Sequence, residues 1–271
     1  MCDYIIEAVS SILRSAPISY VKWDMNRNMT EIGSALLDSE HQGEVEHRYM
    51  LGLYRVLETI TQSFPDVLFE SCSGGGGRFD AGLLYYMPQT WTSDDTDAIE
   101  RLKIQYSTSM VYPISAIGSH VSAVPNHQTG RTTPMQTRCD VAMSGNFGFE
   151  LDLSKLSEDD MATAKKAVEL CKRIRGTVQQ GEFTRLLSPY EGSMTAWQFV
   201  RGDAVILCYF KVLNVPAEPL RRIKMKGLDP DAHYRAEDGT VYSGGALMNM
   251  GYPADWRMRD FESRVILLEK V

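Results

Sequence analysis

The chain has 271 residues, which is enough for one large α/β domain or for a domain with a smaller companion. Hydrophobic residues make up 44% and charged residues 23%, the balance of a globular protein rather than a disordered one. The net charge of −7 and the lack of a block rich in Lys and Arg argue against nucleic-acid binding, which requires a clustered basic face.

The cysteine pattern indicates a reducing compartment. The five cysteines are odd in number and widely spaced, which argues against a disulfide framework and against a zinc ribbon. No segment reaches the roughly 18 apolar residues of a membrane helix. The N-terminal stretch carries Asp3 and Glu7 and no early positive charge, so we do not expect a secretory signal. We therefore expect a cytoplasmic protein that does not bind a membrane.

Between residue 3 and about residue 185, strand-like apolar runs alternate with helical patterns. The strand-like runs cover 18–24, 67–72, 89–95, 116–122 and 146–153. The helical patterns cover 1–13, 43–65, 78–88, 96–113, 133–145 and 157–181. This alternation predicts βαβ units and a parallel sheet. About five strands fit either an open doubly wound sheet or part of an eight-stranded barrel.

The pattern changes to all-β after about Leu187. Residues 194–213 predict two strands around a Gly-Asp turn, residues 231–248 a hairpin, and residues 261–271 a final strand. We expect a second domain over residues 187–271, built as a small antiparallel β-sandwich.

Three of the predicted strands end in unusually polar segments. These segments are 22–27, 70–73 with four glycines after it, and 91–97. Because the carboxyl ends of parallel strands share one rim, their carboxylates, donors and two tryptophans are expected to meet there. Such a rim suits a sugar, and two carboxylates flanking a sugar are the groups that glycoside hydrolysis needs.

The first candidate carboxylate is Asp24. It stands beside Lys22 and Arg27, so an ion pair and a catalytic role are both open from the local sequence.

The second candidate comes from the aspartates at 94, 95 and 97. Asp97 lies three residues before Glu100 at a helix start and is predicted to be an N-cap. Asp95 is read as a loop residue. Asp94 lies nearest the strand end and has no capping task, so it is favoured as the second carboxylate.

Other polar positions have simpler interpretations. The run at 73–78 matches no phosphate-loop pattern and is better suited to close backbone approach. Cys72 is read as a small contact residue rather than a nucleophile. His120 and His127 belong to no cluster with metal-ligand spacing. A structural hydrogen-bonding role is favoured for them, and a place for one of them in the pocket lining stays open.

Three motifs in this order carry a resemblance to a known family. KWDMNR, ESCSGGGGRFD and WTSDDTD closely resemble the microbial α-galactosidases of glycoside hydrolase family 36, and so do the longer stretches LLYYMPQTWTSDDTDAIERLKIQYSTSMVYP and GSHVSAVPNHQTGR. The resemblance implies a retaining hydrolase of terminal α-galactosides such as melibiose, raffinose and stachyose. It makes Asp24 the nucleophile and Asp94 the acid/base of a double displacement, with no metal or other cofactor.

Substrate contacts are also implied by the motifs. The resemblance carries them to Lys22, Trp23, Asn26, Cys72, Gly75 and Trp91. Arg27 is expected to support the loop from behind. Retention of configuration predicts that the two carboxyl groups lie roughly 5–6 Å apart, whereas about 9 Å would indicate inversion.

The resemblance also places this chain within a longer fold. In the family, the KWD motif ends the fourth strand of a (β/α)₈ TIM-type barrel and the WTSDD motif ends the sixth. Residues 1–186 would then form a partial barrel of about strands four to eight, followed by the β domain. Family members are often homo-oligomers. Two alternatives stay open: a galactosyl transferase of the raffinose or stachyose synthase type, and an inactive segment that needs the missing half of the barrel.

Overall fold

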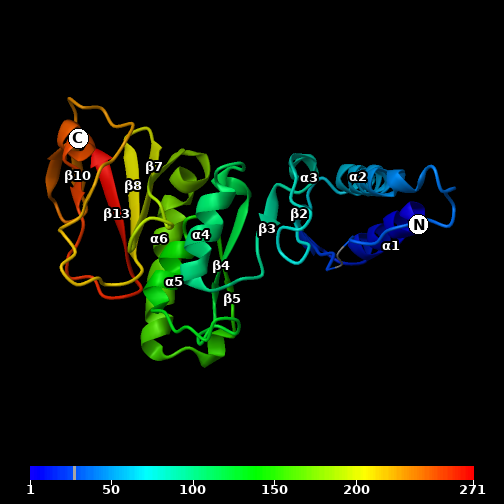
Figure 1. Cartoon of the computed structure of the whole chain (residues 1–271), viewed down its shortest axis with the longest axis horizontal. Helices are drawn as coiled ribbons and strands as arrows, with labels where there is room; N and C mark the ends of the chain where they lie inside the picture. The colour runs from blue at the N-terminus through cyan, green and yellow to red at the C-terminus, as the bar shows by residue number, and fades with distance from the viewer. Residues whose placement is uncertain (27–28) are drawn as a thin grey trace. The chain divides into compact units, whose positions relative to one another are not determined.

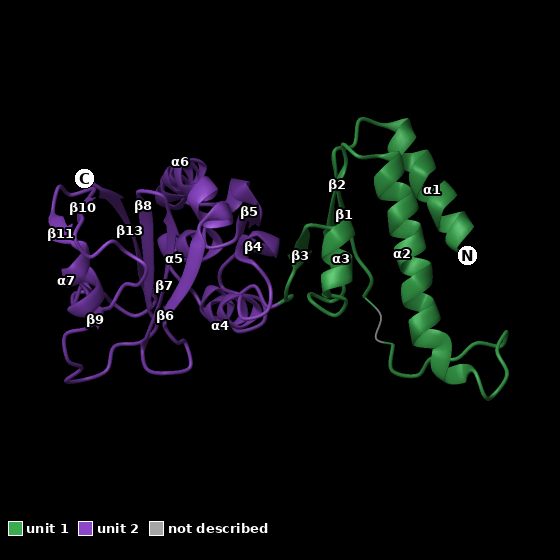
Figure 2. Cartoon of the chain, turned by 90° about the horizontal axis from the view of Figure 1, so that it is seen from above, with its two compact units in different colours: residues 1–94 green, residues 95–271 purple. Residues whose placement is uncertain are grey.

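The computed structural model describes residues 1–26 and 29–271, so the role expected of Arg27 lies outside the described residues. The chain divides into two compact units, Met1–Asp94 and Asp95–Val271 (Figure 2). Over the described ranges, no helix combines the length and the apolar content needed to cross a membrane.

Unit 1 alternates strands and helices in chain order (Figure 1). Its elements are α1 (Cys2–Ser15), β1 (Tyr20–Trp23), η1 (Gln42–Glu44), α2 (Val45–Ser63), β2 (Leu68–Ser71), α3 (Ala81–Tyr86) and β3 (Gln89–Trp91). The strands are parallel, with β2 between β1 and β3. This arrangement confirms the predicted βαβ order, and α2 ends just before Pro65 as expected.

The core of unit 1 lies between its sheet and its helices. Leu57 and Ile60 of α2 are fully buried and pack with Phe69 of β2. Val21 and Trp23 reach the same cluster from β1. Because side chains alternate along a strand, Tyr20 and Lys22 lie on the opposite face of β1.

Unit 2 begins with further helix and strand pairs and ends in an antiparallel sheet. Its first part contains α4 (Ala98–Thr108), η2 (Ile114–Ala116), β4 (Ile117–Ser122), α5 (Met135–Ala142), β5 (Asn146–Glu150), η3 (Leu153–Lys155) and α6 (Glu158–Gln180). Its second part contains β6 (Glu182–Leu187), β7 (Met194–Arg201), β8 (Ala204–Lys211), β9 (Arg222–Ile223), β10 (His233–Ala236), β11 (Val241–Ser243), α7 (Gly244–Asn249), β12 (Tyr252–Pro253) and β13 (Glu262–Lys270).

The strands of the second part form one sheet in the order β11-β10-β13-β8-β7-β6, and β9 pairs separately with β12. In the first part, β4 and β5 are parallel. One shared core joins the two parts, because Ile174 of α6 and Val141 of α5 pack with Trp197, Phe199 and Phe210 of the sheet.

Most of the predicted elements are present, and three details differ. The antiparallel sheet already begins at Glu182, because β6 pairs with β7. Residues 244–249 form a short helix where the hairpin was expected to continue. By its contacts the chain divides after Asp94, whereas the predicted domain boundary lies at 186/187. That boundary and the sandwich arrangement stay predictions.

Candidate active site

The ends of β1 and β2 bring two of the predicted site residues together. Trp23 is in register with Ser71, and the ladder continues past both strands. Cys72 donates its backbone N–H to the carbonyl of Trp23 at 3.0 Å, and Met25 donates to the carbonyl of Cys72 at 3.2 Å. Asp24 and Cys72 therefore leave adjacent strands at the same level.

The surroundings of Asp24 favour its ionised form. Partial burial acts to raise the pKa of Asp24, but hydrogen bonds from Asn26, Cys72 and the Met25 amide, together with the charge of Lys22, outweigh it and lower the pKa. The Asn26 bond joins Nδ2 to a carboxylate oxygen over 3.0 Å. Asp24 is thus a carboxylate at neutral pH, as an attacking group must be.

Asn26 links Asp24 to the glycine loop. Its amide oxygen accepts the backbone N–H of Gly74 at 2.8 Å while its amide nitrogen donates to Asp24. The hydroxyl of Ser73 donates to the Met25 carbonyl at 2.6 Å. The loop after β2 is therefore fastened to the segment that carries Asp24.

The same loop lies against the segment that carries Asp94. Gly75 has a φ of +79°, and a Cβ built on it would lie 2.6 Å from the Cα of Ser93 and 3.0 Å from the backbone nitrogen of Asp94. A Cβ on Gly76 would lie 2.9 Å from the carbonyl oxygen of Thr92. Only glycine allows this approach, so the expected close backbone contact is present.

Trp91 connects Asp94 with Lys22. The indole nitrogen of Trp91, which is buried at the end of β3, donates to a carboxylate oxygen of Asp94 at 3.1 Å. The ammonium of Lys22 lies 5.2 Å from the centre of the Trp91 ring, a cation–π arrangement. Lys22, Asp24, Asn26 and Asp94 are all exposed.

Two predicted contacts are placed differently from the rest. Trp23 packs in the core of unit 1, with its ring centre 6.4 Å from that of Phe69. Cys72 is buried, and this burial raises the pKa of its thiol, so the neutral thiol hydrogen-bonds to Asp24. Cys72 is therefore suited to holding the carboxylate and unsuited to acting as a nucleophile.

One residue that supports the site was not predicted. The guanidinium of Arg78 donates to the Cys72 carbonyl at 2.9 Å and to the Trp23 carbonyl at 3.4 Å. These carbonyls stand at the ends of β2 and β1, so Arg78 ties the two strand ends together from the end of the glycine loop. Its position directly after four glycines was the available signal.

The remaining polar candidates have structural roles in unit 2. Asp97 caps α4 by accepting from the N–H groups of Ile99 at 2.8 Å and Glu100 at 3.2 Å, which confirms the predicted N-cap. Nδ1 of His120 lies 3.2 Å from a carboxylate oxygen of Glu150. Within residues 1–26 and 29–271, no group of three or more His, Cys, Asp or Glu side chains is arranged to hold a metal ion.

Two family models together match most of this chain. The melibiase family model matches residues 1–181, and the model of the glycosyl hydrolase family 36 C-terminal domain matches residues 194–268. The chain belongs to glycoside hydrolase family 36.

Curated relatives and solved structures support the assignment over the whole chain. α-Galactosidase AgaA of Geobacillus stearothermophilus is 58% identical over 273 residues, which is 100% of this chain and 37% of AgaA. α-Galactosidase 1 of Pediococcus pentosaceus is 47% identical over 264 residues, which is 96% of this chain and 36% of that protein. The crystal structure of AgaA superposes with a TM-score of 0.96, covering 100% of this chain and 38% of that one. The chain thus spans a little over a third of these relatives.

Proposed function

We propose that this chain carries the catalytic segment of a retaining α-galactosidase, with Asp24 as nucleophile and Asp94 as acid/base. One observation carries the proposal: a single glycine loop holds both carboxylates. Gly74 is bonded to Asn26, the partner of Asp24, and the next residue, Gly75, packs on the backbone of Ser93 and Asp94. Two carboxylates fixed to one rigid support are the arrangement that double displacement needs.

Two structures of one relative, AgaA, add support. In crystal structures of AgaA variants with raffinose and with stachyose, an aspartate is replaced by asparagine in the first and by alanine in the second. Those two aspartates are separated by the same number of residues as Asp24 and Asp94. We infer that terminal α-galactosides of this kind are the substrates.

In the first step, ionised Asp24 attacks the anomeric carbon while Asp94 protonates the departing oxygen. The indole N–H of Trp91 fixes the carboxyl group of Asp94 for this transfer. Lys22 and Asn26 lie beside Asp24 and offer donors to sugar hydroxyls.

In the second step, the galactosyl–Asp24 ester is hydrolysed. Asp94 gave its proton to the departing oxygen in the first step, so it is now a carboxylate that can take a proton from the attacking water. Water then attacks the anomeric carbon from the face that the leaving group vacated, which retains the configuration.

A sugar acceptor in place of water would make the same carboxylates perform galactosyl transfer. We favour hydrolysis, because the relatives with the matching sequence are named α-galactosidases. Synthase activity would be detected as the formation of raffinose from an activated galactoside and sucrose.

The pocket is proposed to need further protein around it. The side chains of Lys22, Asp24 and Asn26 are exposed, whereas glycosidase carboxylates work in a site closed to bulk water.

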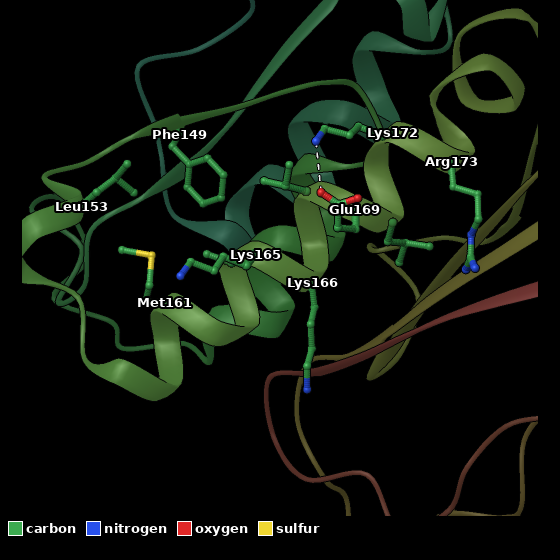
Figure 3. Close-up of a pocket in the computed structure, with 11 residues that line it drawn as sticks. Phe149, Leu153, Met161, Lys165, Lys166, Glu169, Lys172 and Arg173 are labelled. Carbon is green, nitrogen blue, oxygen red and sulfur yellow. Dashed lines mark hydrogen bonds and ion pairs between the residues drawn. The ribbon is translucent and has the colours of Figure 1, made fainter.

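In unit 2, β5 ends its sheet, and a cavity of about 1140 Å³ runs along α6. Figure 3 shows Phe149, Leu153 and Met161 around this cavity, with the lysines of α6 beside them. We infer that a further strand and helix of the barrel cover this face in the complete enzyme.

Release of nitrophenol from an aryl α-galactoside tests the proposal. The purified chain and its Asp24→Ala variant are assayed side by side, with circular dichroism to establish that both are folded. Turnover that is lost in the variant supports the nucleophile. If the chain is inactive, the assay is repeated after adding the upstream part of AgaA that this chain does not match as a separate polypeptide. Equal activity of the unchanged chain and its Asp24→Ala variant would refute the role of Asp24.

A further inference from the structure

A second hollow in unit 2 shares no residue with the Asp24 site. It has a volume of about 210 Å³ and opens between the loop after β8 and the loop before β13. Its lining includes Lys211, Glu218 and Arg221 from the first side and Asp255 and Trp256 from the second. A hollow of this size suits a single small ring rather than a helix or strand of a partner.

The floor of the hollow is polar and charged. Lys211 is only 6% exposed and forms an ion pair with Glu218. Glu218 also accepts the hydroxyl of Ser193 at 2.6 Å and lies 3.7 Å from the guanidinium of Arg221. A charged pair removed from water is costly unless polar groups surround it, and here those groups border an open hollow. The floor therefore offers both a carboxylate and cationic donors to hydroxyl groups.

An indole forms one wall. Trp256 is 70% exposed, whereas Trp91 and Trp197 are buried. The Arg257 guanidinium lies 5.3 Å from the centre of the Trp256 ring. Leu220, at 79% exposed, and Val215 continue the apolar rim. An exposed indole beside a polar floor presents a flat apolar surface and hydrogen-bonding groups to the same ligand.

The walls are held in place before any ligand binds. Asn214 donates from its backbone and from its side chain to one oxygen of Asp260, at 2.7 and 2.9 Å, which ties the two loops together. Ala254 donates its N–H to the Arg221 carbonyl at 3.1 Å. Ala217 is held at a φ of +58°, a conformation that a residue with a Cβ adopts at a cost. Such pre-organisation lowers the cost of binding.

We propose that this hollow is a saccharide-binding site that takes one hexose unit of a neutral oligosaccharide. The C–H face of a pyranose would lie on Trp256, and its hydroxyls would bond to Glu218, Lys211 and Arg221. The lining holds two cations, Lys211 and Arg221, and two carboxylates, Glu218 and Asp255, so their charges balance and favour a neutral ligand. This site can hold sugar whether or not the chain hydrolyses it.

The indole N–H resonances of the tryptophans in the isotope-labelled chain test the proposal. Raffinose and melibiose are added to the chain carrying Asp24→Ala, so that the sugar is not consumed. We expect a saturable shift of the Trp256 resonance, assigned from its loss in Trp256→Phe. In Trp256→Ala, binding to this site, followed on the backbone amides of Asn214 and Arg221, is expected to weaken about tenfold or more. Glu218→Gln should weaken binding, and circular dichroism establishes that this variant is folded, because Lys211 loses its charged partner.

Tyr85→Ala provides the matched control. Tyr85 is also an exposed aromatic side chain, at 78%, and it does not line the hollow at Trp256. It should not change the titration. If the Trp256 indole resonance does not shift at a high sugar concentration in the folded chain, the proposal is overturned. A shift that follows protein concentration instead of sugar would also overturn it, since this would mean that a second copy of the chain occupies the rim. Neither result depends on whether Asp24 is catalytic.

Discussion

Gly75 packs against Ser93 so closely that a Cβ at position 75 would lie 2.6 Å from the Cα of Ser93. Real side chains do not make such contacts, so the absence of a side chain at Gly75 sets how near the glycine loop can come to Asp94. The same loop is bonded to Asn26 through Gly74. The glycine loop thus contacts both segments that carry the proposed catalytic carboxylates.

The first prediction concerns this contact. Gly75→Ala is expected to displace the Ser93–Asp94 backbone and to lower the free energy of unfolding by about 2–4 kcal/mol, because overpacking adds to the cost of a positive φ. Gly74→Ala is the matched control: its φ is +54°, and its Cβ would meet nothing within 4 Å. It should lose only about 1–2 kcal/mol. Urea unfolding of both variants measures the difference, and equal losses would contradict the close contact.

The second prediction concerns Asp94 as a proton donor. Replacing Asp94 by alanine should slow raffinose hydrolysis by a factor of about 10²–10⁴, because the alkoxide leaving group needs a proton. Nitrophenolate is a stable anion that leaves without one, so the first step on a nitrophenyl galactoside should be slowed far less. The ratio of the two rates, measured in the active enzyme form, checks this. A uniform loss on both substrates would point to a structural role for Asp94.

The third prediction concerns Asn26. Removing its amide in Asn26→Ala takes a hydrogen bond from the Asp24 carboxylate, so the pKa of Asp24 should rise toward its ordinary range. Because Asp24 must be ionised to attack, the acidic limb of the pH–rate profile should move to higher pH. Titration of the labelled Asp24 carboxyl by NMR reads the same change without turnover. Thr30→Ala, an exposed polar position of the following loop, should leave the pKa unchanged.

Local patterns were sufficient to predict most of the helices and strands. The N-cap at Asp97 and the end of α2 before Pro65 follow from short-range hydrogen bonding and sterics, which the neighbouring residues determine. The alternation of side chains in β1 also predicts which way Trp23 faces, which the KWD motif alone does not. Lys22 and Asp24 share one face, so Trp23 had to face the helices.

Tertiary contacts could not be predicted in the same way. Nothing in the local sequence at Gly75 specifies that Ser93 lies against it, because the contact depends on how β3 is placed beside the glycine loop. Likewise, the bond from Arg78 to the carbonyl of Trp23 joins residues that are 55 positions apart. The start of the antiparallel sheet at Glu182 was missed because β6 is defined by its pairing with β7.

The fourth prediction concerns Asp140, a carboxyl group between α5 and β13. It is 1% exposed and accepts hydrogen bonds from Ser263 at 2.6 Å and from Gln136 at 2.7 Å. Burial raises its pKa to about 6, because those bonds only partly offset the loss of water. In the unfolded chain the group has its ordinary pKa of about 3.9, so between these values the folded state binds more protons.

Stability should therefore fall as the pH rises from about 4 to about 6.5, and then level off. The contribution of Asp140 to this fall is about 3 kcal/mol, from a difference of roughly two pKa units. Asp140→Asn should remove it, which urea unfolding of both proteins across this pH range would measure as a difference curve. Ser263→Ala is the companion variant. It removes a hydrogen bond that lowers the pKa of Asp140, so the stability of this variant should continue to fall to a higher pH. A difference curve for Asp140→Asn that stays flat from pH 4 to 7 would mean that the buried carboxyl group does not titrate there.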